Sequence, residues 1–255
     1  MLESANIEPT GRVDFRQEMA LNRENFLLHK LHSLTGIIPI GFYMLQHLTL
    51  NSFALAGPDK FNAVIAFFEG VPKHILLALE LGVILIPILF HGIYGLFITQ
   101  RAEVNVYQRK YRFTENWMYL FQRATGVALF FLIILHVSTT TVAAKYLGRG
   151  VEHIQYAGMQ RMLTDNGYLG LILYAIGVLL ASYHLCYGLW NFCIRWGITV
   201  SEASQVALRK FSFAAFLVVT ALGWAALAGF LIHKPDAAAE PIQASAPAAV
   251  AQSAL

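Results

Sequence analysis

Charged residues are scarce in this 255-residue chain, since Asp, Glu, Lys and Arg make up only 13% of it. That is about half the share that is usual in soluble globular proteins. Hydrophobic residues account for 57% of the chain. This balance excludes a disordered chain, a nucleic-acid-binding domain and an ordinary soluble enzyme, and it predicts a protein that lies in the lipid bilayer. The net charge of +3 is too small to indicate an anionic partner.

Cysteine is nearly absent, with only Cys186 and Cys193 in the chain. They lie seven positions apart, too far for a C-x-x-C redox pair, and they form no zinc or iron–sulfur signature. The C-x-x-C-H pattern of covalent haem attachment is also missing, so a haem in this chain would be bound non-covalently, as haem b. Residues 1–25 lack an apolar core, so we expect no cleavable signal peptide.

The sequence is instead rich in long apolar stretches. A membrane-spanning helix needs about 20 mostly apolar residues. Such stretches lie at about 30–54, 74–100, 117–144, 167–195 and 211–233. We therefore predict an all-α membrane protein with five transmembrane helices, in a domain that covers residues 26–233. A polar segment, 1–25, precedes this domain, and the composition of the Ala/Pro-rich tail 234–255 predicts disorder.

The positions of Lys and Arg predict how these helices are oriented. Twelve of the 18 lie before the first span, between the second and third, or between the fourth and fifth, and the other six lie at the opposite ends. Lys and Arg are enriched in cytoplasmic connections. The N-terminus is therefore predicted to lie in the cytoplasm and the C-terminus outside, with Arg109 inside and Lys60 outside.

Four of the nine histidines lie deep in predicted spans, one on each of the first four helices. They are His47, His91, His136 and His184. Ionisable residues at membrane depth are uncommon and indicate function. A lone histidine could also be a neutral imidazole that bridges two helices. Four of them, one per helix, make that interpretation much weaker.

The sequence around these histidines repeats. HGIYG at 91–95 on the second helix matches HLCYG at 184–188 on the fourth. A Thr-Gly pair precedes the histidine on both the first and the third helix, at 35–36 and 125–126. At 1.5 Å per residue, the histidines of the second and fourth helices lie about 15–17 Å from the inner boundary, and the other two lie roughly 20–26 Å from it. The chain therefore predicts an inner and an outer pair.

A pair of histidines at one depth on facing helices is the arrangement for bis-imidazole ligation of a haem. Both axial positions are then filled, so the haem would carry electrons and would not bind oxygen. Gly36, Gly95, Gly126 and Gly188 would let a porphyrin approach the helices closely. Zinc or copper is a weaker alternative, because their ligands normally cluster on fewer elements at one depth.

These motifs resemble the di-haem cytochrome b subunit of succinate:quinone oxidoreductases, the family of succinate dehydrogenases and quinol:fumarate reductases. The resemblance covers about residues 25–230 and fits best the single-polypeptide type with two haems. It lies in the segments 31–36, 46–48, 90–95, 121–126, 136–137, 184–190 and 195–200.

The resemblance implies a bundle of the first four helices around two stacked b haems. His91 and His184 would hold the proximal haem, and His47 and His136 the distal one. A flavoprotein subunit with FAD and an iron–sulfur subunit would dock on the cytoplasmic face of a bacterial cytoplasmic membrane. The chain would be the quinone-reactive subunit, with menaquinone as the expected quinone, and it would not contact succinate.

Four residues at the inner helix ends are expected to bond haem propionates, because charge-assisted hydrogen bonds are favourable there. They are His32, Ser33, Arg123 and Arg195. The two arginines could instead be ordinary positive-inside anchors. In the outer connection, Glu69 corresponds to a family carboxylate that exchanges protons with the quinol. The alternative for Glu69 is a solvated acid at a helix N-terminus, where negative charge is favoured.

Other functions compatible with buried histidines are argued against by particular features. The cytochrome b of a hydrogenase or formate dehydrogenase also has bis-histidine haems, but the blocks at 33–47 and 195–200 do not fit it. A proton-coupled transporter usually has broken helices and more spans, whereas Pro39 and Pro87 are the only prolines well inside spans here. Some fumarate-reducing members carry a carboxylate where this chain has Ser182, which favours succinate oxidation.

Overall fold

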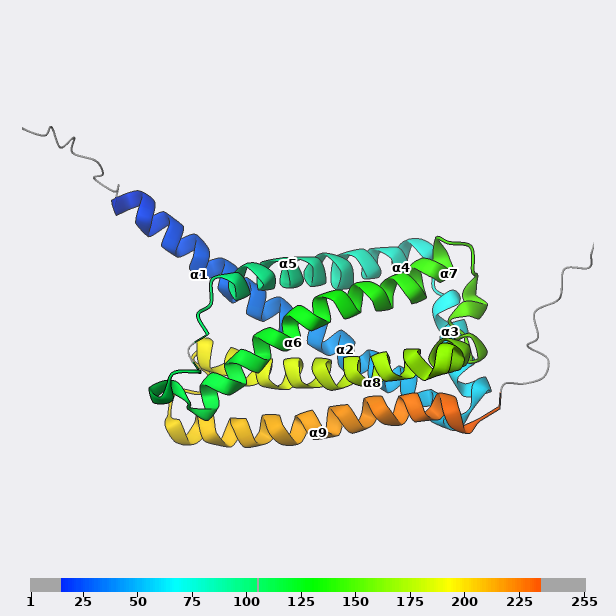
Figure 1. The fold of residues 1–255 in the computed structure, drawn as a ribbon. Helices are drawn as coiled ribbons and strands as arrows, with labels where there is room; N and C mark the ends of the chain where they lie inside the picture. The colour runs from blue at the N-terminus through cyan, green and yellow to red at the C-terminus, as the bar shows by residue number, and fades with distance from the viewer. Residues whose placement is uncertain (1–14, 105, 235–255) are drawn as a thin grey trace, which may run out of the picture.

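The computed structural model describes residues 15–104 and 106–234, and this part of the chain is helical without any β-strand (Figure 1). The longer helices are α1 (Phe15–Ile37), α2 (Ile40–Asn51), α3 (Pro58–Glu69), α5 (Ile86–Gln100), α6 (Thr114–Val137), α8 (Tyr156–Arg195) and α9 (Glu202–Ile232). The short ones are η1 (Ser52–Ala56), α4 (Lys73–Leu79), η2 (Glu80–Leu85), η3 (Arg109–Tyr111), η4 (Ser138–Val142), α7 (Ala143–Lys145) and η5 (Val151–His153).

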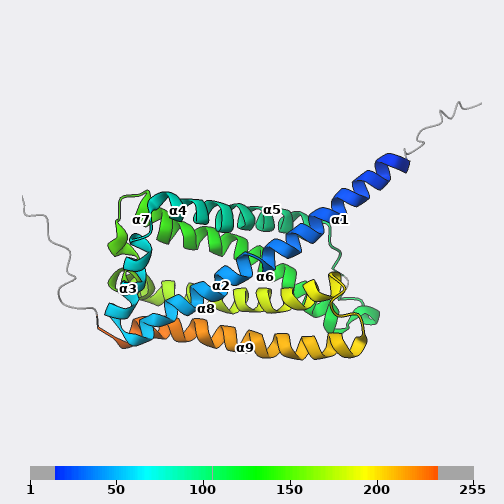
Figure 2. The same cartoon turned by 180° about the vertical axis from the view of Figure 1, so that it is seen from behind.

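The helices form an elongated bundle. α5, α6, α8 and α9 run along its length, and α1 followed by α2 crosses it on one side (Figures 1 and 2). α8 packs on α9 and α6, α1 packs on α5 and α8, and α2 packs on α9. The start of α1, the described residues of the connection after α5 (101–104 and 106–113) and the connection 196–201 lie at one end, which is the Lys/Arg-rich set predicted from the sequence. We call this the inner end, and the opposite one the outer end.

Four helices are long and apolar enough to cross a membrane among the residues described: Lys73–Gln100, Thr114–Lys145, Tyr156–Arg195 and Glu202–Ile232. They contain the second to fifth spans predicted from the sequence. The first predicted span, 30–54, is not among them, because it is divided between the end of α1 and α2. The tail 235–255 and residues 1–14 lie outside the described residues, whereas 15–25 form the start of α1.

Two prolines account for departures from regular α-helix. The break between α1 and α2 falls at Ile38 and Pro39, and Pro39 has no N–H to donate and a ring that crowds the preceding turn. Pro87 is the second residue of α5, which follows directly on the π-helix η2. The wider π turn accommodates the proline ring within a helix that otherwise continues from Lys73 to Gln100.

α8 is divided near its start. Residues 165–168 are non-helical, and Asn166, Gly167 and Tyr168 adopt left-handed backbone angles. The 40 residues of α8 would span about 60 Å if straight, twice the thickness of a bilayer core. The break therefore separates a short outer segment, 156–164, from the apolar segment predicted to span the membrane from residue 167.

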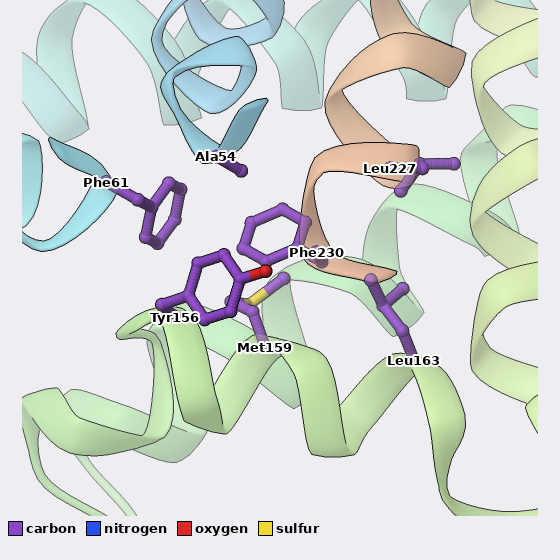
Figure 3. Close-up of a cluster of buried hydrophobic side chains, with 7 residues drawn as sticks. All are labelled: Ala54, Phe61, Tyr156, Met159, Leu163, Leu227 and Phe230. Atoms are coloured by element: carbon purple, nitrogen blue, oxygen red, sulfur yellow. The ribbon is translucent and has the colours of Figure 1, made fainter. Parts of the chain in front are cut away.

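The outer segment of α8 closes one end of the bundle. Its Tyr156 is fully buried against Phe61 of α3 and Phe230 of α9, and its Leu163 is fully buried in the same cluster (Figure 3). The Tyr156 hydroxyl donates to the carbonyl oxygen of Gly229 at 2.7 Å. This cluster fixes the end of α9 against η1 and α3, so the outer connections form a packed cap.

We expect Gly229→Ala to destabilise the protein by about 1–3 kcal/mol, because overpacking displaces backbone. A Cβ at position 229 would lie 2.6 Å from backbone atoms of Ala54 and Leu55 in η1. The matched control is Gly177→Ala, since a Cβ on this helical glycine meets no atom within 4 Å. Thermal unfolding of the purified protein in detergent checks both. Equal melting temperatures for the two variants would contradict the tight contact between α9 and η1.

Candidate functional site

The inner pair of histidines comes together from α5 and α8. The rings of His91 and His184 have centroids 6.0 Å apart and are nearly perpendicular, at 86°. A metal–imidazole bond is about 2 Å and the ring centre lies about 1 Å further, so two imidazoles on opposite sides of one iron have centroids roughly 6 Å apart. The separation of this pair therefore fits bis-imidazole ligation.

The outer pair comes together from α2 and α6. The centroids of His47 and His136 are 5.8 Å apart, with an interplanar angle of 78°. Tyr43, one turn earlier on α2, stacks on His47 at 5.6 Å. The structure thus brings the four histidines into the two pairs that repeat and depth predict. In the residues described, no three His, Cys, Asp or Glu side chains gather to hold a metal, so the pairs are the candidate ligands.

Each inner histidine is oriented by a backbone carbonyl of a neighbouring helix. Nδ1 of His91 lies 2.9 Å from the carbonyl oxygen of His32 on α1. Nδ1 of His184 lies 3.1 Å from the carbonyl oxygen of Gln122 on α6, with the Thr125 hydroxyl at 3.3 Å. A carbonyl only accepts, so Nδ1 carries the proton in both rings. Nε2 is then left as the free ligand atom.

Glycines make room for these contacts. A Cβ at Gly36 would clash with the His91 ring, and one at Gly126 would lie 2.9 Å from Cε1 of His184. Gly95 and Gly188 face the side chains at 32 and 122 in the same way, at 3.1 and 3.2 Å. From the sequence, these four glycines were predicted to contact a porphyrin. In the structure they admit the imidazoles and the side chains beside them.

Two buried polar atoms beside the inner pair have no hydrogen-bond partner, Nδ1 of His32 and Oε1 of Gln122. They belong to the residues whose carbonyls orient the inner histidines, and the His32 ring stacks on His91 at 4.0 Å. An unpaired buried polar group costs about 1–3 kcal/mol. These orphaned atoms, together with the ring separations, fit a bound group with polar substituents at this level.

The other inner residues predicted to contact propionates lie in two places. Ser33 Oγ accepts from Trp196 Nε1 at 3.0 Å, and the Arg195 carbonyl accepts from Lys30 Nζ, so Ser33 and Arg195 lie near the same α1–α8 junction. The Arg123 guanidinium instead donates to the Glu103 carbonyl at 3.3 Å in the connection after α5. Arg123 is thus engaged apart from that junction.

Polar contacts near the outer pair involve residues that the sequence analysis did not single out. Nδ1 of His136 lies 3.1 Å from the hydroxyl of Tyr174 on α8. Just after His136, α6 continues as the π-helix η4. Nε2 of His153 lies 2.8 Å from the carbonyl oxygen of Thr139 in η4. Since a carbonyl only accepts, His153 is the donor. A tyrosine within an apolar span carries no motif, so only the fold identifies Tyr174.

The two outer acids differ in environment. Glu69 is the last residue of α3 and is exposed, so it lies at a helix C-terminus and not at the N-terminus considered in the sequence analysis. Glu80 begins the π-helix η2 and forms an ion pair with Lys145 at the end of α7. This ion pair joins the second and third predicted spans near the outer end.

Comparisons with known proteins identify the family of the chain. The family model described as succinate dehydrogenase/fumarate reductase transmembrane subunit matches residues 99–227. The succinate dehydrogenase cytochrome b558 subunit of Bacillus subtilis is 35% identical over 213 residues, which cover 84% of this chain and all of that protein.

More distant similarity extends to a fumarate-reducing complex. The fumarate reductase cytochrome b subunit of Helicobacter pylori is 27% identical over 207 residues, covering 76% of this chain and 75% of that protein. These matches decide against the hydrogenase, formate dehydrogenase and transporter alternatives. The chain belongs to the succinate dehydrogenase/fumarate reductase transmembrane-subunit family, as the membrane-anchoring cytochrome b subunit of such a complex.

Proposed function

We propose that this subunit binds two b haems, an inner one between His91 and His184 and an outer one between His47 and His136. The observation that carries the proposal is the ring separation of 6.0 and 5.8 Å in the two pairs. A haem held by two of these imidazoles would supply one-electron transfer without oxygen binding. The protein supplies the ligands, their tautomers and an apolar surrounding.

The inner end has donors suited to carboxylates. His32 presents an unpaired buried Nδ1 beside the inner pair, and Ser33 lies near Arg195. We propose that His32, Ser33 and Arg195 bond propionates. For Arg123 to join them, its guanidinium would have to leave the Glu103 carbonyl.

We also propose five spans, with the end of α1 and α2 together forming the first. Residues 31–58 carry no Asp, Glu, Lys or Arg. Backbone hydrogen bonds run up to the break and resume directly after it: Ile38 N donates to the Leu34 carbonyl at 2.7 Å on the α1 side, and Tyr43 N donates to the Pro39 carbonyl at 2.9 Å on the α2 side. A kinked helix of this kind keeps most of its backbone groups paired, as a bilayer requires.

The proposed partners lie at opposite ends. A flavoprotein subunit with FAD and an iron–sulfur subunit dock at the inner end, in the cytoplasm of a bacterium. Menaquinone reacts near the outer pair and exchanges protons through Glu69, which is exposed at the outer end. Electrons that move outward while protons are taken from outside are driven by an inside-negative potential, at about 2.3 kcal/mol per charge per 100 mV.

We expect each histidine pair to fail as a pair. Replacing His47 or His136 by alanine removes the outer haem, and replacing His91 or His184 removes the inner one, because one axial ligand is lost. Reduced-minus-oxidised spectra and potentiometric titration of the purified variants measure this. His74→Ala, at an exposed site on α4, is the control. A wild-type protein without a b-type band would refute haem binding, and loss of the same haem from the His47 and His91 variants would refute the pairing.

The predicted orientation can be tested with single cysteines. Lys60 in α3 and Arg109 in the connection between α5 and α6 are exposed, and the native Cys186 and Cys193 are buried. In intact cells we expect an impermeant thiol reagent to label Lys60→Cys and not Arg109→Cys. Both should react after solubilisation and denaturation. The reverse pattern in intact cells would invert the topology.

We expect Glu69→Gln to retain both haems and the succinate–dye activity of the soluble subunits, while quinone-linked turnover falls at least roughly 100-fold, the usual loss on removing an acid–base group. Asp59→Asn, at an exposed acid in the first turn of α3, is the matched control. Normal quinone turnover in the Glu69 variant would move proton exchange elsewhere, and Glu80 would be the next residue to replace.

A further inference from the structure

The two histidine pairs differ in what their Nδ1 atoms contact. Both inner rings face backbone carbonyls, at 2.9 and 3.1 Å. In the outer pair, His136 faces a side chain instead, the hydroxyl of Tyr174 at 3.1 Å. The hydrogen-bond partner of a ligating imidazole sets its tautomer, its orientation and its basicity. Tyr174 is therefore the residue through which the protein can adjust the outer pair separately.

The hydroxyl of Tyr174 donates to a side chain other than His136. It lies 3.4 Å from Sδ of Met162, which is an acceptor only. Its oxygen therefore keeps lone pairs for the Nδ1–H of His136. This direction of hydrogen bonding places the imidazole proton on Nδ1 and leaves Nε2 free, as in the inner rings.

The break in α8 creates this arrangement. Met162 and Tyr174 are 12 residues apart, which is about 18 Å along an uninterrupted helix. The left-handed residues Asn166, Gly167 and Tyr168 turn the chain so that the two side chains meet. Met162 also packs on the buried cap at the outer end. The position of the Tyr174 hydroxyl is thus fixed by its own helix after the break and by Met162 before the break.

We propose that Tyr174 is a positioning residue for the outer haem. Its hydroxyl oxygen accepts a hydrogen bond from Nδ1–H of His136 and thereby sets the reduction potential at that site. The inference rests on the proposed function, since it needs a haem on His47 and His136. An imidazole whose N–H is hydrogen-bonded donates more electron density to iron and stabilises the oxidised form. Loss of the acceptor therefore raises the potential.

The test is Tyr174→Phe, which keeps the ring that packs against the bundle and removes only the hydroxyl. Tyr156→Phe is the matched control, because it removes another tyrosine hydroxyl from the same helix, one that donates to the main-chain carbonyls of Gly229 and His233 and not to an imidazole. Potentiometric titration of the purified subunit resolves the two haems. We expect an upward shift of the outer potential in the Tyr174 variant alone, with the inner potential unchanged.

The outcomes separate the inference from the function on which it rests. Selective loss of the outer haem from Tyr174→Phe, with both haems kept in Tyr156→Phe, would also support the positioning role. Unchanged potentials, equal shifts of both haems or a shift of the inner haem alone would overturn it. A wild-type subunit without two b haems would instead refute the proposed function.

Discussion

The inner half of the bundle depends on one kind of contact, the hydrogen bond from a buried histidine to a main-chain carbonyl of the next helix. The carbonyls of His32 and Gln122 lie within α1 and α6, and each has a second lone pair to offer to His91 or His184. In apolar surroundings an imidazole N–H without a partner costs about 1–3 kcal/mol. Each helix pair is therefore held at one rotation and one axial position, because in any other arrangement the imidazole N–H would lose its carbonyl acceptor.

The same contact explains why the sequence repeats. One helix of each contact provides the carbonyl and, four residues later, a glycine that makes room for the imidazole, Gly36 or Gly126. The other helix provides the histidine and, four residues later, a glycine that faces the side chain of the carbonyl-bearing residue, Gly95 or Gly188. The Thr-Gly and H-x-x-Y-G patterns are thus the two halves of one helix–helix contact that occurs twice in the molecule.

Sequence reasoning anticipated the features that depend on regular helices. Because the rise per residue is constant, spacing alone arranged the four histidines in two layers, and apolar length alone located the second to fifth spans. It failed where backbone geometry departs from regularity. The division at Pro39 separates the first span, and the left-handed turn at Asn166 brings Met162 to Tyr174. Glu69 is the C-terminal residue of α3, whereas the sequence had suggested a helix N-terminus beside this acid. These outcomes depend on tertiary packing at the outer end, which periodicity does not encode.

The two π-helices have a consequence for how related sequences align. A π turn holds one more residue than an α turn, so η2 before His91 and η4 after His136 each act as a single-residue insertion on the outer side of a histidine. A relative with regular helix at these points would have its outer connections displaced by one position when the histidines are superposed. Glu80 and Lys145, which meet across the two helices beside these turns, would then no longer face each other. In an alignment, a single-residue gap beside one of these histidines would thus indicate that the outer part of its helix is rotated, while the inner part of the bundle is unchanged.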